Sequence, residues 1–498
     1  MLYEEMMMDS STLLKFKLFK KIMFLGSQSY PIAVIASDMN LNYQQTVIDL
    51  TDIDKELAAM NPDHQSILLG GGKINCQNLS CTIDEYRYQL LKSSVPFQFI
   101  LYFLNEEAPT IDDFCVKFYA SRSTVSRKIA KLKRYLKDRH LRFTYTEAGM
   151  SGDERIIRLA LFDLLWLGVR SIEWPFTISE ETADRLVEGY AKYFPLARTY
   201  VGRHELKFFA AIFYQRIQKN KFVRYDQAYN FLMEDNSYYD FTSLKDMIDL
   251  EMTDEQLKAE SSFIFFLAHL SPFYTLEDDA TLKQTIKDFA HRPNPVIRLV
   301  RDYLDFAKQE FFADDPKLLD YPIIMGNLIN ISFGYYIIKR PFPTIQQLVE
   351  GNTENLRSLK KIENTTQEWF YNLSQESDYT SFITEENYPL IAKSFTEVLL
   401  PFIDLNKESE KVIVGIALEH NYLLVKKIYS YLSDLRFVEA EPFDSTKINH
   451  YDLAISSSLL LKKRYPQQEV FLWDHAGDEN QLIALYKRLR QRFIAKNE

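Results

Sequence analysis

Nine basic side chains are concentrated in one short stretch of the sequence, residues 121–142. They are Arg122, Arg127, Lys128, Lys131, Lys133, Arg134, Lys137, Arg139 and Arg142. Asp138 is the one acidic residue among them, so the stretch carries a net charge of +8 in a chain of formal net charge −10. Guanidinium and ammonium groups concentrated in this way neutralise phosphates and release their counterions. The stretch therefore has the chemistry of a nucleic-acid contact.

Apolar residues in and before this stretch recur at helical spacing. A first helix, capped by Thr110 with Asp113 three positions later, would bury one set of these apolar residues. A second helix, capped by Ser121, would bury another set. The sets are Ile111, Phe114, Cys115 and Phe118, then Val125, Ile129, Leu132 and Leu136. Two short helices joined through residues 119–121 predict a helix-turn-helix, whose second helix enters the major groove of DNA.

The first turns of that second helix would reach base edges and phosphates of double-stranded DNA. The candidate DNA-binding residues are Ser121, Arg122, Ser123, Thr124, Ser126, Arg127, Lys128, Lys131 and Arg134. A solvated basic helix that touches an acidic domain is the alternative explanation of the charge. We favour DNA, because phosphate neutralisation requires such a concentration of positive charge on one helix.

The same pattern occurs 79 residues earlier. The corresponding cap is Asn42, and the corresponding apolar positions are Ile32, Ile35, Ala36 and Met39, then Thr46, Leu50, Ile53 and Leu57. The second helix of this earlier unit is acidic, with Asp49, Asp52, Asp54 and Glu56 against Lys55. We therefore expect a first unit that either contacts DNA weakly through residues 43–45 (YQQ) or only scaffolds the second.

A glycine-rich hairpin, or wing, is predicted after each unit. The first joins residues 67–69 to residues 73–74 through Gly70, Gly71 and Gly72. The second joins residues 141–146 to a strand over residues 155–159, with a turn through Gly149 and Gly152. No GK[ST] sequence follows the triple glycine, so a hairpin turn explains it better than a phosphate-binding loop.

The middle of the chain, from about Phe176 to Leu400, reads as successive amphipathic helices. Examples are Ala183–Phe194, His204–Gln218, Leu257–Leu270 and Pro295–Glu310. The longest apolar stretch, 321–338, includes Asn327, Asn330 and Ser332 and predicts a buried helix rather than a membrane span. The middle is expected to form two helical bundles.

Catalytic and metal-binding patterns are not found. No histidine lies at a metal-ligand spacing, and Cys76, Cys81 and Cys115 fit neither a zinc site nor a disulfide framework. No nucleophile triad, carboxylate pair or phosphate loop can be defended, so we expect no enzyme, no cofactor and no metal. Reduced cysteines and an N-terminus without the order of a signal peptide indicate a cytoplasmic protein with no membrane partner.

The last hundred residues alternate strands with helices. Strands are predicted at residues 411–418, 437–440, 451–456 and 469–473, and helices at 420–432 and 481–493. This order is typical of a small parallel α/β domain. The loop at residues 419–421 is where such folds place ligands, but it has no glycine-rich fingerprint, so nucleotide binding is unsupported.

The predicted fold is mainly α and multidomain. Its parts are two winged helix-turn-helix units at 10–80 and 81–170, helical regulatory domains at 176–290 and 291–400, and an α/β domain at 408–498. This order resembles the Mga family of Gram-positive virulence regulators. The most specific signal lies in residues 110–114 (TIDDF), 121–129 (SRSTVSRKI) and 149–158 (GMSGDERIIR). The resemblance implies a transcription activator that forms a homodimer or higher oligomer.

The same resemblance implies control by the sugar phosphotransferase system. The helical domains resemble the family's regulatory domains that this system controls, and the tail looks like an enzyme IIB component. His204 and His269 are then the candidate phosphorylation sites, with Arg203 to steady the added charge and a phosphocarrier protein as partner. A phosphohistidine near a helix start or a dimer interface would shift association.

Two departures from the family pattern stand out. No histidine lies between His291 and His420, so phosphorylation of the second regulatory domain is unsupported unless that domain includes His291. The tail has no cysteine and lacks the thiol chemistry of many IIB proteins. We expect the tail to be a sensor or oligomerisation domain, with His420 a remote candidate acceptor.

Three other functions remain open. The leading alternative is a protein-level component of sugar phosphotransferase signalling without DNA binding. An RNA-binding antiterminator with the same regulatory domains would begin with a small β-domain, whereas this N-terminus is helical. A structural scaffold would not explain duplicated helix-turn-helix units.

Overall fold

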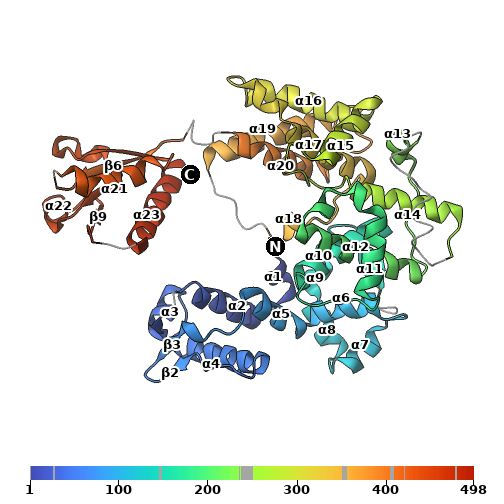
Figure 1. Cartoon of the computed structure of the whole chain (residues 1–498), viewed down its shortest axis with the longest axis horizontal. Coiled ribbons are helices and arrows are strands. Elements are labelled where there is room, and N and C mark those ends of the chain that lie inside the picture. The colour runs from blue at the N-terminus through green and yellow to red at the C-terminus, as the bar shows by residue number, and fades with distance from the viewer. Residues whose placement is uncertain are drawn as a thin grey trace. The chain divides into compact units, whose positions relative to one another are not determined.

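The computed structural model describes residues 2–25, 28–144, 149–234, 236, 251–349, 356–403, 409–419, 421–476 and 479–498 (Figure 1). The chain divides into two compact units. The first comprises Met1–Arg298 and Ile329–Gly351, and the second Leu299–Leu328 and Asn352–Glu498. Helices dominate, which confirms the predicted mainly α class. The five predicted domain boundaries stay a prediction, because these units are larger than the predicted domains.

The first unit begins with helices and a small antiparallel sheet. The elements are α1 (Tyr3–Met7), α2 (Ser10–Met23), β1 (Ser29–Pro31), α3 (Ile32–Asp38), α4 (Tyr43–Met60), β2 (Leu68–Leu69), β3 (Lys73–Asn75) and η1 (Cys76–Asn78). The strand order is β1-β3-β2, and Leu68 pairs with Ile74. The predicted first hairpin is therefore present. Gly71 and Gly72 have φ of 75° and 71°, which explains why its turn needs glycine.

The next part of this unit contains the basic stretch. Its elements are α5 (Ile83–Lys92), α6 (Val95–Asn105), α7 (Ile111–Lys117), α8 (Arg122–Lys128), α9 (Ala130–Lys137), β4 (Arg142–Thr144), β5 (Gly149–Ser151) and α10 (Glu154–Val169). β4 and β5 are antiparallel, with Phe143 opposite Met150. The ring of Phe99 on α6 contacts both Phe114 and Phe143, with centroids 5.1 Å apart in each pair. One aromatic core thus holds α6, α7 and the hairpin together.

Two sequence predictions in this region are wrong. The strand predicted over residues 155–159 is the first part of α10, which begins where Asp153 accepts a hydrogen bond from the N–H of Arg155 at 3.0 Å. A buried apolar run fits a helix as well as a strand, and here the cap decides. The helix predicted after Ser121 is interrupted at Ile129, with ψ of 2°, so α8 and α9 are separate helices.

The rest of the first unit is helical. Its elements are α11 (Glu180–Tyr190), η2 (Ala191–Tyr193), η3 (Pro195–Arg198), α12 (Tyr200–Gln218), η4 (Gln227–Tyr229), α13 (Asn230–Met233), α14 (Asp254–Leu267), α15 (Ala280–His291) and α18 (Ile345–Val349). The predicted helices correspond to α11 with η2, α12 and α14. They begin three or four residues earlier than predicted, because Ser179, Thr199 and Thr253 cap them.

Two helices, α16 (Pro295–Glu310) and α17 (Pro322–Ile338), run across the boundary between the units. The helical part of the second unit also has η5 (Pro316–Asp320), α19 (Arg357–Leu373), α20 (Tyr388–Leu399) and η6 (Leu400–Phe402). Tyr303 packs against Phe370 and Phe395 in its core. α16 has the bounds that the sequence predicts. Among the described residues, no helix is long and apolar enough to cross a membrane.

The end of the second unit is a parallel sheet with helices. Its elements are β6 (Val412–Ala417), α21 (Tyr422–Ser433), β7 (Val438–Pro442), η7 (Ser445–His450), β8 (Leu453–Ser456), α22 (Leu459–Arg464), β9 (Val470–Leu472) and α23 (Glu479–Asn497). The strand order is β7-β6-β8-β9, with every pair parallel. All four predicted strands are confirmed, whereas α22 was not predicted. His420 lies outside the described residues.

Candidate nucleic-acid interface

Two turns that lie 79 residues apart have the same backbone geometry. α3 and α7 are each followed by a left-handed residue, Asn40 and Tyr119, with φ of 52° in both. The next N–H donates to the carbonyl oxygen five residues earlier, at 2.8 Å from Leu41 to Ala36 and at 3.0 Å from Ala120 to Cys115. The predicted duplication is therefore present in the hydrogen bonds of the backbone as well as in the apolar pattern.

The caps of the second helices also correspond. Asn42 accepts hydrogen bonds from the N–H groups of Gln44 and Gln45, and Ser121 accepts one from Thr124 at 3.2 Å. The predicted second-helix positions are all fully buried: Thr46, Leu50, Ile53, Leu57, Val125, Ile129, Leu132 and Leu136. Both helix-turn-helix segments thus have their polar first turns turned away from the core, as a groove-reading helix requires.

The candidate DNA-binding residues lie on the solvent side of α8 and α9. Ser121, Arg122, Ser123, Arg127, Lys128, Lys131 and Arg134 are exposed, and Thr124 and Ser126 are half-buried. Polar side chains dominate the first turn of α8, whereas the longer cations follow along α8 and α9. The structure therefore places all nine residues on one continuous stretch of two short helices.

Three of these cations have partners within the protein. Arg122 forms a forked ion pair with Asp112 on α7, its Nε lying 2.6 Å from Oδ1. Lys128 lies 3.3 Å from the carboxylate of Asp9, and Lys131 donates to the carbonyl oxygen of Glu5 at 2.8 Å. The hydrogen bond from Arg122 lowers the pKa of Asp112. DNA would have to compete with these contacts, which were not predicted from the sequence.

Four other cations are exposed and, among the residues that the structure describes, contact no carboxylate. They are Arg127, Arg134, Lys137 and Arg142. Arg127 is on α8, the next two are on α9, and Arg142 begins the hairpin. We call these four residues the free cation set. Their charge is available to phosphates without the loss of an internal ion pair.

Arg139 is half-buried and bound inside the protein, so it does not belong to this set. Its guanidinium lies 3.8 Å from the ring centroid of Tyr135 and donates to the carbonyl oxygen of that residue at 2.8 Å. It also donates to the side chain of Gln347. Lys133 is half-buried. The charge of the basic stretch therefore divides between a surface and a structural part.

An acidic side chain of α4, Asp54, connects this helix to the first hairpin. Asp54 accepts hydrogen bonds from His64 at 2.9 Å, from Ser66 at 2.8 Å and from the N–H of Ile67 at 2.8 Å. Burial alone would raise the pKa of Asp54, but these hydrogen bonds outweigh it and lower the pKa. The acid that weakens α4 as a phosphate binder thus anchors the strand region of the first hairpin.

The two candidate phosphorylation sites lie in different surroundings. His204 is half-buried in the first turn of α12, and its Nδ1 lies 2.9 Å from the carbonyl oxygen of Tyr200. His269 is 3% exposed, and its ring packs against Phe289 and Phe333. Burial lowers the pKa of His269 to about 4. A phosphoryl donor can approach His204 directly, whereas His269 requires its packing to open.

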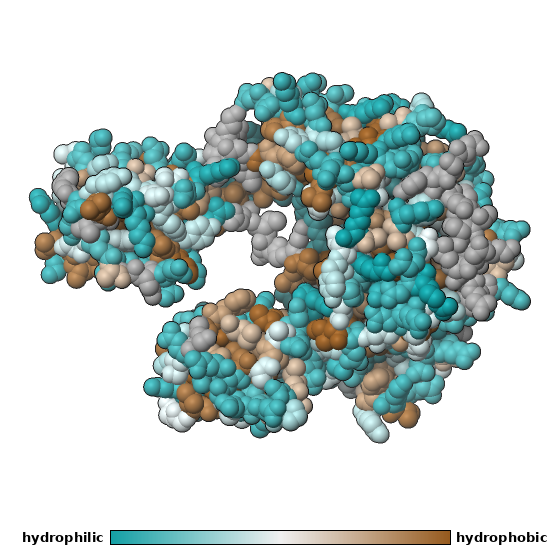
Figure 2. Space-filling view, viewed as in Figure 1, coloured by the Kyte–Doolittle hydropathy of each residue, from teal (hydrophilic) through white to brown (hydrophobic). Residues whose placement is uncertain are grey.

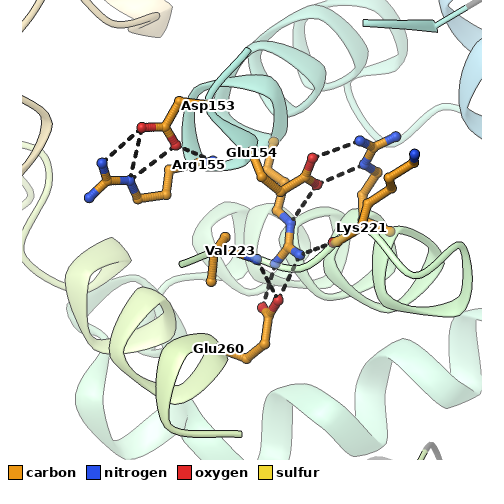
Figure 3. Close-up of polar contacts among 8 residues, drawn as sticks. Asp153, Glu154, Arg155, Lys221, Val223 and Glu260 are labelled. Atoms are coloured by element: carbon orange, nitrogen blue, oxygen red, sulfur yellow. Dashed lines mark hydrogen bonds and ion pairs between the residues drawn. The ribbon is translucent and has the colours of Figure 1, made fainter. Parts of the chain in front are cut away.

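A buried ion-pair network joins α10 to the helices beyond it (Figure 3). Glu154 accepts from Arg158 at 3.0 Å and from Arg216 of α12 at 2.7 Å. Arg158 also donates to Glu260 of α14, at 2.6 and 2.9 Å. Sequence reasoning missed this network. The spacing of Glu154 and Arg158 by four residues was its one visible sign.

Residues 79–165 match the family model of the Mga helix-turn-helix domain. This segment therefore resembles the Mga helix-turn-helix domain, and we call it the Mga domain. It contains every candidate DNA-binding residue, both strands of the second hairpin and most of α10. The match with the family model confirms, for this segment, the resemblance predicted from the sequence. No curated protein matches the chain.

Proposed function

We propose that the protein is a transcription regulator that binds double-stranded DNA, with the first turn of α8 in the major groove. The observation that carries the proposal is the free cation set, which lies on α8, α9 and the start of β4 inside the segment that matches the Mga helix-turn-helix domain. In this proposal Arg127 and the hydroxyls of Ser123 and Ser126 read base edges, while Arg134 and Lys137 neutralise phosphates. The function includes no catalytic step.

The duplication offers a matched pair of variants for a test. Arg134 on α9 and Lys55 on α4 occupy equivalent positions, 79 residues apart, and both are exposed. Arg134→Ala should weaken duplex DNA binding by about three- to tenfold, because one phosphate contact is lost. Lys55→Ala removes the same charge from the acidic unit and should leave the affinity unchanged. Fluorescence anisotropy with a labelled duplex measures both.

An equal loss of DNA affinity in the two variants would mean that binding depends on the total charge of the protein rather than on the basic helices α8 and α9. No loss in either, together with no wild-type binding at low salt, would favour the alternative function. In that case the protein would act in phosphotransferase signalling at the protein level, through its histidines and its α/β tail.

We propose further that phosphorylation of His204 tunes the regulator, which acts as an activator and as a homodimer or higher oligomer. The carbonyl oxygen of Tyr200 can only accept, so Nδ1 of His204 carries the hydrogen and Nε2 keeps its lone pair. Nε2 is then the nucleophile towards a phosphocarrier protein. Tyr200 and Val201 beside it are 83% and 56% exposed and offer that partner an apolar contact.

Incubation with a phosphorylated phosphocarrier protein tests this step. We expect an acid-labile phosphoryl group on His204, located by mass spectrometry, and its loss in His204→Ala. His269→Ala serves as the control and should be labelled like the wild type. Labelling of His269 instead of His204 would contradict the assignment and would require the packing of His269 against Phe289 and Phe333 to open. Absence of any label would remove phosphorylation control from the proposal.

A further inference from the structure

A large polar pocket lies behind the second hairpin, within the first unit. Its volume is about 1100 Å³. The loop from Glu107 to Thr110 and the turn from Gly149 to Arg155 line one side, and the end of α12 with residues 218–222 lines the other. Arg340 completes the wall. The pocket thus lies between the Mga domain and the helical region that follows it.

Cations outnumber acids in the pocket wall. The cations are Arg155, Arg216, Lys219, Lys221, Arg224 and Arg340, and the acids are Glu107, Asp153 and Glu154. The charge of two acids is already neutralised inside the protein. Asp153 pairs with Arg155 at 2.8 Å, and Glu154 pairs with Arg216 at 2.7 Å. The wall therefore keeps a surplus of positive charge after its internal ion pairs are formed.

Three cations supply this surplus. Lys221 and Arg224 are exposed and, within the described ranges, contact no carboxylate. Arg340 is 39% exposed and only approaches Asp153, at 3.6 Å. The carbonyl oxygen of Lys221 accepts a hydrogen bond from Arg158 at 2.8 Å, which ties the backbone there to the network (Figure 3). The side chain of Lys221 thus projects from a rigid point of the network.

Lys219 contributes in another way. Its ammonium donates to the carbonyl oxygens of Phe103, Leu104 and Glu106 at the end of α6, so it is bound to the wall. Burial, followed by the charge of Arg216, lowers the pKa of Lys219 to about 8. An anion in the pocket would favour the protonated form of Lys219 and gain from it in return.

We propose that this pocket binds a small metabolite through a phosphate monoester. Two guanidinium groups and an ammonium without full partners form a donor set that suits a phosphate dianion. The pocket is concave and large enough for a ligand of metabolite size, whereas a DNA backbone passes over convex surfaces and is already served by the free cation set. The bound phosphate would join the turn before α10 to the loop after α12.

This ligand would connect metabolite concentration to DNA binding. One wall of the pocket belongs to the Mga helix-turn-helix domain and the other does not, so a ligand that contacts both favours one arrangement of the two. If the ligand changes the affinity for DNA, DNA must change the affinity for the ligand by the same factor. The binding claim itself does not depend on the DNA proposal.

Isothermal titration calorimetry of the full chain tests the proposal. The probes are inorganic phosphate, glucose 6-phosphate and AMP, with glucose and adenosine as uncharged counterparts. We expect binding of phosphate and of at least one ester, no binding of the uncharged pair, and a loss of about tenfold or more in Lys221→Ala/Arg224→Ala. Arg185→Ala removes an exposed cation of α11 outside the pocket and should bind like the wild type.

Failure of all three phosphate probes to bind would overturn the proposal, as would equal binding by the double variant and the wild type. The same variants are then measured with duplex DNA in the absence of metabolite. If the double variant loses DNA affinity and keeps phosphate binding, Lys221 and Arg224 contact the DNA backbone instead, and the pocket is not a metabolite site. Loss of phosphate binding with unchanged DNA affinity supports the proposal even if the DNA-binding assignment of α8 fails.

Discussion

Arg158 shows how one residue can hold several helices in register. Its side chain is 2% exposed and donates to Glu154, to Glu260 and to the carbonyl oxygen of Lys221. Removing one partner of a buried ion pair destabilises the fold by more than the intact pair stabilises it, because the remaining charge is left buried without compensation. The network is therefore a sensitive point between α10 of the Mga domain and the helices that follow it.

Glu260→Gln should lower the free energy of unfolding by about 3 kcal/mol, since the charge of Arg158 remains buried while one of its two carboxylate partners is lost. The N–H of Val223, which donates to Glu260 at 3.0 Å, loses a charged acceptor as well. Urea denaturation followed by circular dichroism measures the change.

Glu255→Gln is the matched control, because Glu255 is exposed on the same helix, α14. It should change the free energy of unfolding by no more than about 0.5 kcal/mol. A Glu260→Gln protein as stable as this control would show that the network contributes nothing to the fold.

The exposed cations of α8 and α9 were predictable from the sequence, but most of their contacts within the protein were not. The charge of residues 121–142 identified the exposed cations of α8 and α9. It could not reveal that Lys128 meets Asp9 or that Lys131 meets the backbone of Glu5, because each pair lies more than 100 residues apart and depends on how α1 and α2 pack. The pair of Arg122 and Asp112 is only ten residues apart, but it too depends on how two helices, α7 and α8, pack.

At the scale of elements, the turn between α7 and α8 repeats the turn between α3 and α4. Each places one residue in the left-handed region, where an asparagine is more easily accommodated than a tyrosine. Tyr119 is 99% exposed, so its ring contributes no packing that would offset the strain. The turn between α7 and α8 is therefore the more strained of the two.

Substitutions at Tyr119 should separate backbone strain from side-chain packing. Tyr119→Gly is expected to keep or raise the melting temperature, because glycine adopts positive φ without cost. Tyr119→Val should destabilise by about 1–2 kcal/mol, because a β-branched residue is disfavoured there. Differential scanning calorimetry compares the two. A valine variant as stable as the glycine variant would contradict the left-handed geometry.

The elements themselves were largely predictable where the pattern is strong. The alternation of apolar strands and helices predicted all four strands of the C-terminal sheet, and the apolar offset of 79 residues predicted both helix-turn-helix segments. The prediction failed at residues 155–159, where a run buried on all sides has no period that separates strand from helix. It also failed at Ile129, because α8 and α9 keep one apolar face across the break.

At the scale of the whole molecule, an acidic chain carries a local basic surface on α8, α9 and the start of the second hairpin. The net charge of −10 opposes non-specific binding to nucleic acid, while the free cation set gives local attraction. On α4, Asp54 accepts hydrogen bonds from His64, Ser66 and the N–H of Ile67, so this acid supports the first hairpin. The parallel sheet of the second compact unit confirms the α/β fold predicted for the C-terminal tail. The role of the tail as a sensor or oligomerisation domain stays a prediction.

The measurement that tests the central claim most directly is a salt titration of duplex DNA binding. Wild type is compared with Arg127→Ala/Arg134→Ala/Lys137→Ala, and Lys55→Ala serves as the control. Each phosphate contact contributes about 0.9 to the slope of log affinity against log salt, so the triple variant should lose up to about three units of slope. Lys55→Ala should keep the wild-type slope. A triple variant with the wild-type slope would contradict the placement of DNA on α8 and α9.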